Sequence, residues 1–309
     1  MNNITQRDSF WNKVYDLAKE NKDIIVLSAD MGAPSLDKFR TDLSAQFVNV
    51  GIAEQNAILI ASGLAKEGKR VFVYAIAPFI TFRCLEQIRV NNSMMKIPIT
   101  IVGVGAGFGY EDSGPTHHMI EDIALMRSMP DIVINSISDS TMAAAVAEMS
   151  TRMKKANYVR LDRLVLPTLY GQEEDFSKGV AILRPGDIYI AATGSMVHVA
   201  LEAAEKLNKS GVNVGVVDVY TIPINEKNFV EAIDGSKKLI ALEEHFVSGG
   251  FGGAICEVLQ DNAVTIPVKR IGLSMDQGYC YKYGGRDVIR QHYGIDADSV
   301  VQKINEFLK

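Results

Sequence analysis

A glutamate at residue 54 combines a reactive side chain with a position at which α/β proteins bind ligands. It lies in the segment Gly-Ile-Ala-Glu-Gln-Asn at residues 51–56, which follows an apolar run and opens a helical stretch. The helix dipole favours a carboxylate in the first turn, and open α/β sheets bind ligands beyond the carboxyl ends of their strands. Glu54 is therefore a candidate site residue, with a solvated helix-start glutamate as the alternative.

A glycine-rich loop brings two acids and two histidines together. Residues 103–110 carry four alternate glycines, which let the backbone approach a ligand closely. Glu111, Asp112, His117 and His118 follow in the same loop. The glycines match only part of a dinucleotide-binding fingerprint, and adjacent histidines cannot face one metal ion as histidines at i and i+4 do. A metal site is not expected here, and a binding loop stands against a flexible loop with incidental histidines.

Aromatic residues and arginines follow two other apolar runs. Phe79 and Phe82 come after the run at residues 71–76, and core packing of both rings is the simplest interpretation. Arg160 and Arg163 stand at the end of another run, where a guanidinium can grip a phosphate or carboxylate with two hydrogen bonds. Surface salt bridges are the alternative for both arginines.

Two adjacent glutamates and a histidine precede a glycine-rich turn. They are residues 243–245, and the turn follows at residues 248–253. Considered by itself, this segment is also typical of a capped helix start.

These residues stand in a chain where short β-rich apolar runs alternate with longer helical stretches. The runs are nearly continuous in apolar character, as strands covered on both faces should be. In the first half the expected strands are 24–28, 47–50, 71–76, 97–104, 132–134 and 158–161, and the expected helices are 54–66 and 140–155. In the second half the expected strands are 187–193, 213–219 and 238–243, and the expected helix is 196–208.

The alternation predicts an α/β fold with two doubly wound domains, each with a mainly parallel sheet covered by helices. Between residues 164 and 185 the periodicity stops, because two prolines, two glycines and an acidic patch interrupt it. We therefore expect one domain at 1–165, a linker at 166–185 and a second domain at 186–309. The length of 309 residues agrees, since domains average roughly 150 residues.

Composition narrows the class of protein. The net charge of −5 argues against a nucleic-acid surface, which needs clustered Lys and Arg. No apolar run reaches the roughly 18 residues of a membrane span, and the polar start of the chain lacks a signal-peptide core. Cys84, Cys256 and Cys280 lie far apart, so neither a disulfide framework nor a zinc site is expected. We expect a cytoplasmic enzyme.

Taken together, these segments resemble the C-terminal half of transketolase. The segment around Glu54 is similar to that of the family's cofactor glutamate, and Gly-Pro-Thr-His at 114–117 is similar to its donor-substrate loop. Ser-Ala-Asp at 28–30 resembles the phosphate-side loop after the first strand, and residues 243–245 with the glycine-rich turn resemble the third domain. The resemblance implies a pyrimidine-binding domain followed by the transketolase C-terminal domain.

The resemblance also implies an activity, a cofactor and roles for particular residues. The activity is the transfer of a two-carbon ketol unit between sugars or sugar phosphates, and the cofactor is thiamine diphosphate. Glu54 controls a proton of the cofactor's aminopyrimidine ring, and His117 hydrogen-bonds the hydroxyls of the donor. The other implied cofactor contacts are Phe79 or Phe82 by stacking and Asp30. The other implied substrate contacts are His118, Asp112, Arg160 and Arg163, of which Arg163 is similar to the family's phosphate-binding arginine.

The resemblance further implies a partner. The family holds the diphosphate and its metal ion with a Gly-Asp-Gly motif, which this sequence does not contain. A full transketolase is about twice as long and carries that motif in its first domain. The implied partner is an N-terminal transketolase subunit that holds the diphosphate and Mg²⁺ or Ca²⁺, in an expected α2β2 assembly.

Two departures from the family pattern bear on the substrate. Glycine stands at position 105, where many transketolases carry a histidine that assists acceptor-phosphate binding. Ser113 is inserted between Asp112 and Gly114, which puts in question the contact of Asp112 with the donor. The alternatives are the β subunit of a 2-oxo-acid dehydrogenase, a deoxyxylulose-phosphate-synthase-like enzyme and a regulatory subunit without catalysis.

Overall fold

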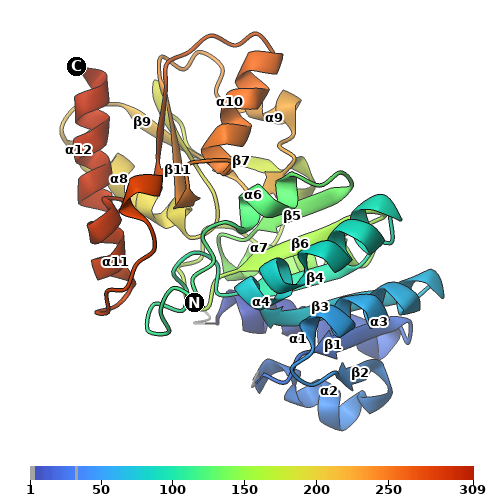
Figure 1. Ribbon diagram of the computed structural model, residues 1–309. Coiled ribbons are helices and arrows are strands. Elements are labelled where there is room, and N and C mark those ends of the chain that lie inside the picture. Colours follow the sequence, from blue (N-terminus) through green and yellow to red (C-terminus); the bar gives the residue numbers. More distant parts are fainter. Residues whose placement is uncertain (1–3, 32–33) are drawn as a thin grey trace. The chain divides into compact units, whose positions relative to one another are not determined.

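The computed structural model describes residues 4–31 and 34–309 (Figure 1). The chain forms two compact units, each described by itself below. Unit 1 contains residues 1–106 and 125–174, and unit 2 contains residues 107–124 and 175–309. The loop with the two histidines therefore belongs to unit 2, although its sequence is inserted within that of unit 1.

Unit 1 is built on a parallel sheet. Its strands are β1 (Ile24–Ser28), β2 (Phe47–Asn49), β3 (Arg70–Ile76), β4 (Thr100–Val104), β5 (Ile132–Ser136) and β6 (Ala156–Leu161). They follow the order β5-β6-β4-β3-β1-β2, and each neighbouring pair is parallel. Every residue of β1, β4 and β6 is buried, because helices cover both faces of the sheet.

The helices of the first half begin at residues that satisfy the free N–H groups of a helix start. They are α1 (Gln6–Glu20), α2 (Asp37–Asp42), α3 (Glu54–Lys66), α4 (Ala77–Thr81), α5 (Leu85–Gln87), a π-helix (Ile88–Met94), α6 (Asp122–Arg127) and α7 (Ser140–Ser150). The Thr5 hydroxyl caps α1, and the Asp139 carboxylate caps α7 by accepting the N–H of Met142 at 2.7 Å. Phe10 and Trp11 anchor α1, because both rings meet Phe72 edge-on in the core.

Unit 2 repeats the architecture with a smaller sheet. Its strands are β7 (Val180–Arg184), β8 (Ile188–Ala192), β9 (Val214–Val219), β10 (Thr221–Ile222), β11 (Leu239–Phe246) and β12 (Val268–Leu273). The sheet order is β12-β11-β8-β9-β7, parallel except that β7 runs antiparallel to β9. The helices are α8 (Met196–Lys209), α9 (Glu226–Ala232), α10 (Phe251–Asp261), α11 (Arg286–Tyr293) and α12 (Ala297–Leu308).

The expected fold class is confirmed, since both sheets are mainly parallel and covered by helices. Some element bounds differ from expectation. The strand expected from residue 97 begins at Thr100, because Pro98 has no N–H to donate to a neighbouring strand. The helix expected to reach residue 155 ends at Ser150, where Thr151 and Arg152 bond back three residues in a tight turn. Strand β7 lies within the 166–185 stretch that was expected to be linker.

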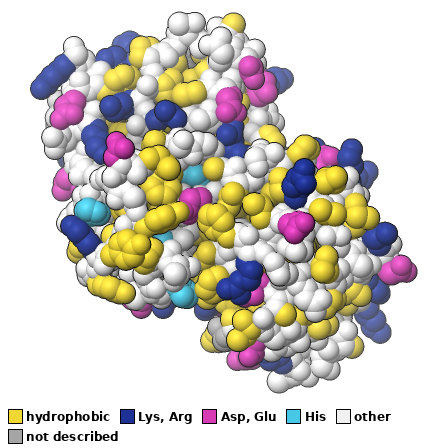
Figure 2. All heavy atoms as spheres, in the orientation of Figure 1, with side chains coloured by type: hydrophobic (Ala, Val, Ile, Leu, Met, Phe, Trp, Pro, Cys, Tyr) yellow, Lys and Arg dark blue, Asp and Glu magenta, His cyan; other side chains and the backbone are white. Residues whose placement is uncertain are grey.

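The surface is mixed in charge. On the face drawn in Figure 2, Lys and Arg side chains are interspersed with Asp and Glu rather than gathered in one basic patch. In the described part of the chain, no helix is both long and apolar enough to cross a membrane.

Candidate active site

The turn between β2 and α3 delivers Glu54 to the carboxyl end of the unit 1 sheet. Gly51 adopts a φ of +71°, and its N–H is held by the Asn49 side chain at 2.9 Å. The Gly51 carbonyl accepts the Asp30 N–H at 3.1 Å, which ties the turn to the end of β1. Glu54 is the first residue of α3 and is only 4% exposed. The fold thus buries a carboxylate at a helix start, as the sequence predicted.

Arg83 is the ionic partner of Glu54. Its guanidinium donates from Nη1 to Glu54 Oε2 at 2.7 Å, and its side chain is 43% exposed. The same guanidinium lies 4.5 Å from the centre of the Phe79 ring, a cation–π contact. Arg83 was not singled out from the sequence, although its spacing of four residues from Phe79 is the spacing that places two side chains on one helical face.

A pocket of about 200 Å³ opens beside this pair. Glu54, Arg83 and Asp30 contribute charged groups to its lining, and Phe79 and Ile52 contribute apolar walls. Phe82, the other aromatic candidate, lies outside this lining and is 46% exposed. A small flat heteroaromatic ring fits such a pocket, because Phe79 offers an aromatic face and Glu54 offers a carboxylate for a ring nitrogen.

Asp30 lies at the rim of this pocket. It follows β1, its side chain is exposed, and its carboxylate accepts a hydrogen bond from the Asn49 side chain at 3.1 Å. Asn49 thus contacts both Asp30 and the Gly51 turn, so one side chain links the two loops that approach Glu54.

The loop at residues 107–124 carries the histidines within unit 2. It is closed at its base by paired backbone hydrogen bonds of 2.8 Å between Gly107 and Met119. At its tip, Asp112 is exposed and His117 is partly exposed, with Nδ1 3.0 Å from the Thr116 hydroxyl. His118 differs: it is 3% exposed, packs edge-on against Phe108, and burial lowers the pKa of its imidazole. The adjacent histidines therefore do not share one environment.

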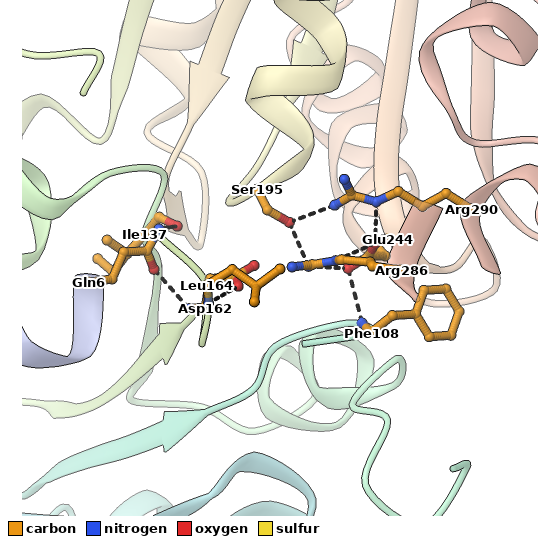
Figure 3. Close-up of polar contacts among 9 residues, drawn as sticks. All are labelled: Gln6, Phe108, Ile137, Asp162, Leu164, Ser195, Glu244, Arg286 and Arg290. Carbon is orange, nitrogen blue, oxygen red and sulfur yellow. Dashed lines mark hydrogen bonds and ion pairs between the residues drawn. The ribbon is translucent and has the colours of Figure 1, made fainter. Parts of the chain in front are cut away.

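The two arginine candidates also differ. Arg160 lies inside β6 and is 4% exposed, so its side chain is packed within unit 1 rather than presented to solvent. Arg163 lies beyond the strand and is partly exposed. Gln6 braces the backbone beside it, since its side chain donates to the Ile137 carbonyl at 3.0 Å and accepts the Asp162 N–H at 2.8 Å (Figure 3). The strand end that presents Arg163 is therefore rigidly held.

Comparisons with known protein families cover both halves of the chain. The family "Transketolase, pyrimidine binding domain" matches residues 2–168, and the family "Transketolase, C-terminal domain" matches residues 179–300.

Individual relatives agree with these families. One of the subunits of the apulose-4-phosphate transketolase of Phocaeicola vulgatus is 33% identical, over 100% of this chain and 99% of that protein. The 1-deoxy-D-xylulose-5-phosphate synthase of Synechocystis is 34% identical over 85% of this chain, which spans only 42% of that longer protein. A solved structure described as a split gene transketolase, inactive beta4 tetramer, superposes with a TM-score of 0.87 at 31% identity, covering 98% of each chain. The chain therefore belongs to the transketolase family, as a split-type subunit with the pyrimidine-binding and C-terminal domains.

Proposed function

We propose that this chain contributes Glu54 to the thiamine diphosphate site of a two-chain transketolase. The assembled enzyme moves a two-carbon ketol unit between sugars or sugar phosphates. The observation that carries this proposal is the buried Glu54 carboxylate beside the Phe79 wall of the unit 1 pocket. Membership of the transketolase family implies dependence on thiamine diphosphate.

The residues of the pocket suit the aminopyrimidine ring of that cofactor. Glu54 would hydrogen-bond a ring nitrogen and manage its proton, and Phe79 would stack on the ring face. When bound, thiamine diphosphate supplies the nucleophilic carbon and the electron sink for breaking the donor's C–C bond. Asp30, at the rim of the same pocket, is our candidate for a contact on the phosphate side of the cofactor. Phe82 is not assigned to the stack, because it lies outside the pocket lining.

Arg83 competes for the same carboxylate. Its guanidinium bonds Glu54 and covers Phe79, which are the two groups that the ring would contact. The ring can meet both only if the guanidinium moves aside or shares the carboxylate. A side chain that is 43% exposed can be resolvated when it moves, so its displacement is inexpensive.

Substrate contacts are assigned to side chains that reach the surface. His117 hydrogen-bonds the donor's hydroxyls, with Asp112 beside it at the exposed tip of the same loop. Arg163 binds the phosphate of a sugar phosphate through paired N–H groups. Arg160 and His118 are left out of direct contacts, because the chain buries both. Gly105 and the inserted Ser113 favour a specialised sugar over the common pentose phosphates.

The partner we propose is an N-terminal subunit with a Gly-Asp-Gly motif that holds the diphosphate and Mg²⁺ or Ca²⁺, two of each chain forming the enzyme. The relative from Phocaeicola vulgatus is named as one of several transketolase subunits, which supports a two-chain enzyme. The test is to tag this chain, co-purify its partner from the native cell, and assay ketol transfer from D-xylulose 5-phosphate or unphosphorylated ketoses to a panel of aldoses. Transfer that requires both chains supports the proposal. A lipoyl-domain partner with 2-oxo-acid decarboxylation would replace it with the dehydrogenase.

The second candidate is deoxyxylulose-phosphate synthesis, favoured by the similarity to the Synechocystis enzyme. The same mixture, given pyruvate and D-glyceraldehyde 3-phosphate, separates the two activities. Carbon dioxide release with these substrates, and no ketol transfer from any ketose, would favour the second candidate.

A further inference from the structure

A buried ionic cluster in unit 2 is centred on Glu244 of β11. The carboxylate is 3% exposed and accepts hydrogen bonds from Arg286 Nε at 3.1 Å and Arg290 Nε at 2.6 Å (Figure 3). Both guanidinium groups also donate to the Ser195 hydroxyl, at 2.9 and 3.2 Å. The fifth member is the backbone N–H of Phe108, which donates to Glu244 Oε2 at 3.0 Å.

Electrostatics keep this carboxylate ionised. Burial opposes the negative charge, but the charges of Arg286 and Arg290 and the hydrogen bonds from Arg286 and the Phe108 N–H outweigh it. The pKa of Glu244 therefore lies well below its ordinary value. A permanently charged acceptor gives the Phe108 N–H a stronger bond than a neutral one would.

Gly107 shows how closely the loop is pressed against this carboxylate. A Cβ at this position would lie 1.9 Å from Glu244 Oε2, and the backbone has a φ of +58°. Only glycine therefore permits the observed approach of loop and carboxylate. The Phe108 ring adds a second contact, since it stacks on Tyr293 of α11 with ring centres 5.4 Å apart.

The next two residues of β11 hold the returning side of the same loop. The Phe246 N–H donates to the Ile120 carbonyl at 3.0 Å. The Ala124 N–H donates to His245 Nε2 at 3.3 Å, while Nδ1 of that ring lies 2.6 Å from the Phe246 carbonyl. Three successive residues of one strand thus fix both ends of a loop whose tip, residues 111–117, carries Asp112 and His117.

We propose that Glu244 is a positioning residue for ketol transfer: it fixes the base of the loop at residues 107–120, so that His117 is already in place when the donor binds. This rests on the proposed function, in which His117 contacts the donor. A loop that is ordered before binding saves the conformational entropy otherwise lost with the substrate, and small displacements of a positioned group reduce catalysis strongly. Loss of the Glu244 contact should therefore weaken donor use and spare acceptor use.

The first test is Gly107→Ala, which places a methyl group where Glu244 lies and leaves every member of the ionic cluster intact. Gly235→Ala is the matched control, since Gly235 is in unit 2 with a φ of +72° and open space around a Cβ. In the isolated chain, hydrogen–deuterium exchange over residues 107–120 should quicken about 10-fold in Gly107→Ala. It should be unchanged in Gly235→Ala, and exchange over α12 should be unchanged in both.

The kinetic arm uses the chain reconstituted with its partner. Gly107→Ala should raise KM for the ketose donor on the order of 10-fold or more, with the KM of the aldose acceptor unchanged. Unchanged loop exchange, or quickened exchange with unchanged donor KM, would overturn the positioning role. The exchange arm needs no substrate, so it still decides whether Glu244 holds the loop if the wild-type pair shows no ketol transfer, an outcome that refutes the proposed function instead.

The second variant is Glu244→Gln, with Glu243→Gln as its control. The Glu243 carboxylate is equally buried, but it caps α10 by accepting the N–H groups of Phe251 and Gly252 at 2.6 and 2.9 Å. Loop exchange should quicken in Glu244→Gln alone, and donor KM should follow it. Equal effects of both substitutions would mean that the loop responds to general loosening of unit 2 rather than to Glu244.

Discussion

Glu54 and Glu244 are both buried glutamates paired with arginine, but their surroundings differ. Glu54 is 4% exposed and has one ionic partner, Arg83, which is 43% exposed and borders a pocket of about 200 Å³. Glu244 is 3% exposed and is held by two buried or nearly buried arginines and a backbone N–H. The difference lies in whether the partner can leave.

An arginine that is partly in water can give up its contact and be resolvated, whereas an arginine buried with its carboxylate cannot. The pair in unit 1 thus suits a carboxylate that must accept a new partner during function. The cluster in unit 2 suits a carboxylate that must not move. The following predictions test this distinction, in order of expected size.

The largest effect should come from Glu54→Gln in the reconstituted enzyme. Glutamine preserves shape but cannot exchange a proton with a ring nitrogen, and acid–base groups contribute on the order of 10²–10⁴-fold. Turnover should fall by that factor, while the thermal midpoint of the isolated chain stays the same. Activity within a few-fold of wild type would remove Glu54 from its proposed role.

Stability should respond in the opposite order. Glu244→Ala leaves Arg286 buried and unpaired, so unfolding by urea should show a loss of about 3–5 kcal/mol. Glu54→Ala leaves Arg83 able to reach water, so its loss should be nearer about 1 kcal/mol. Similar losses in the two variants would contradict the distinction between a releasable and a fixed partner.

The two sites also differ in how far the sequence predicts them. The expected helix at 54–66 coincides with α3, because the apolar pattern, the turn glycine and the ending at Gly68 are local signals. The cluster around Glu244 joins residues 42 and 46 positions apart and a backbone N–H, so no local pattern carries it. Arg286 and Arg290 at i and i+4 also have the spacing of an ordinary basic helix face.

Edge strands were missed for a related reason. Strand β12 exposes Lys269 and Arg270, and β7 is only partly buried, so neither shows the continuous apolar run of an inner strand. Side-chain direction was also beyond the sequence. His117 and His118 are adjacent, yet the first is partly exposed at the loop tip and the second packs beneath it on Phe108.

A smaller effect is expected at Arg163, which tests substrate choice. A bidentate charge-assisted contact contributes about 1.5–3 kcal/mol, so Arg163→Ala should raise KM for a phosphorylated acceptor roughly 10- to 150-fold. Arg163→Lys should recover only part of this loss, because lysine keeps the charge without the fork. The measurement is kcat/KM for a matched aldose and aldose phosphate. If wild type shows no preference and Arg163→Ala matches it, the arginine is structural.

The smallest effect concerns pH. A carboxylate whose pKa is lowered by folding stabilises the protein above its unfolded pKa, and this contribution is lost as the pH falls below it. For Glu244 the ordinary value is 4.5, so its contribution should decline from about pH 5 downward. Urea midpoints between neutral and acidic pH should fall less steeply in Glu244→Gln than in wild type. Parallel slopes would mean that the carboxylate is not held ionised by its arginines.

The central claim is that this chain supplies the pyrimidine side of a cofactor site that a partner completes. Calorimetric titration of thiamine diphosphate with Mg²⁺ into this chain, into the partner and into their mixture tests it most directly. The account predicts weak binding to this chain by itself and tight, metal-dependent binding to the mixture. Tight, Mg²⁺-dependent binding by this chain without its partner would contradict the account.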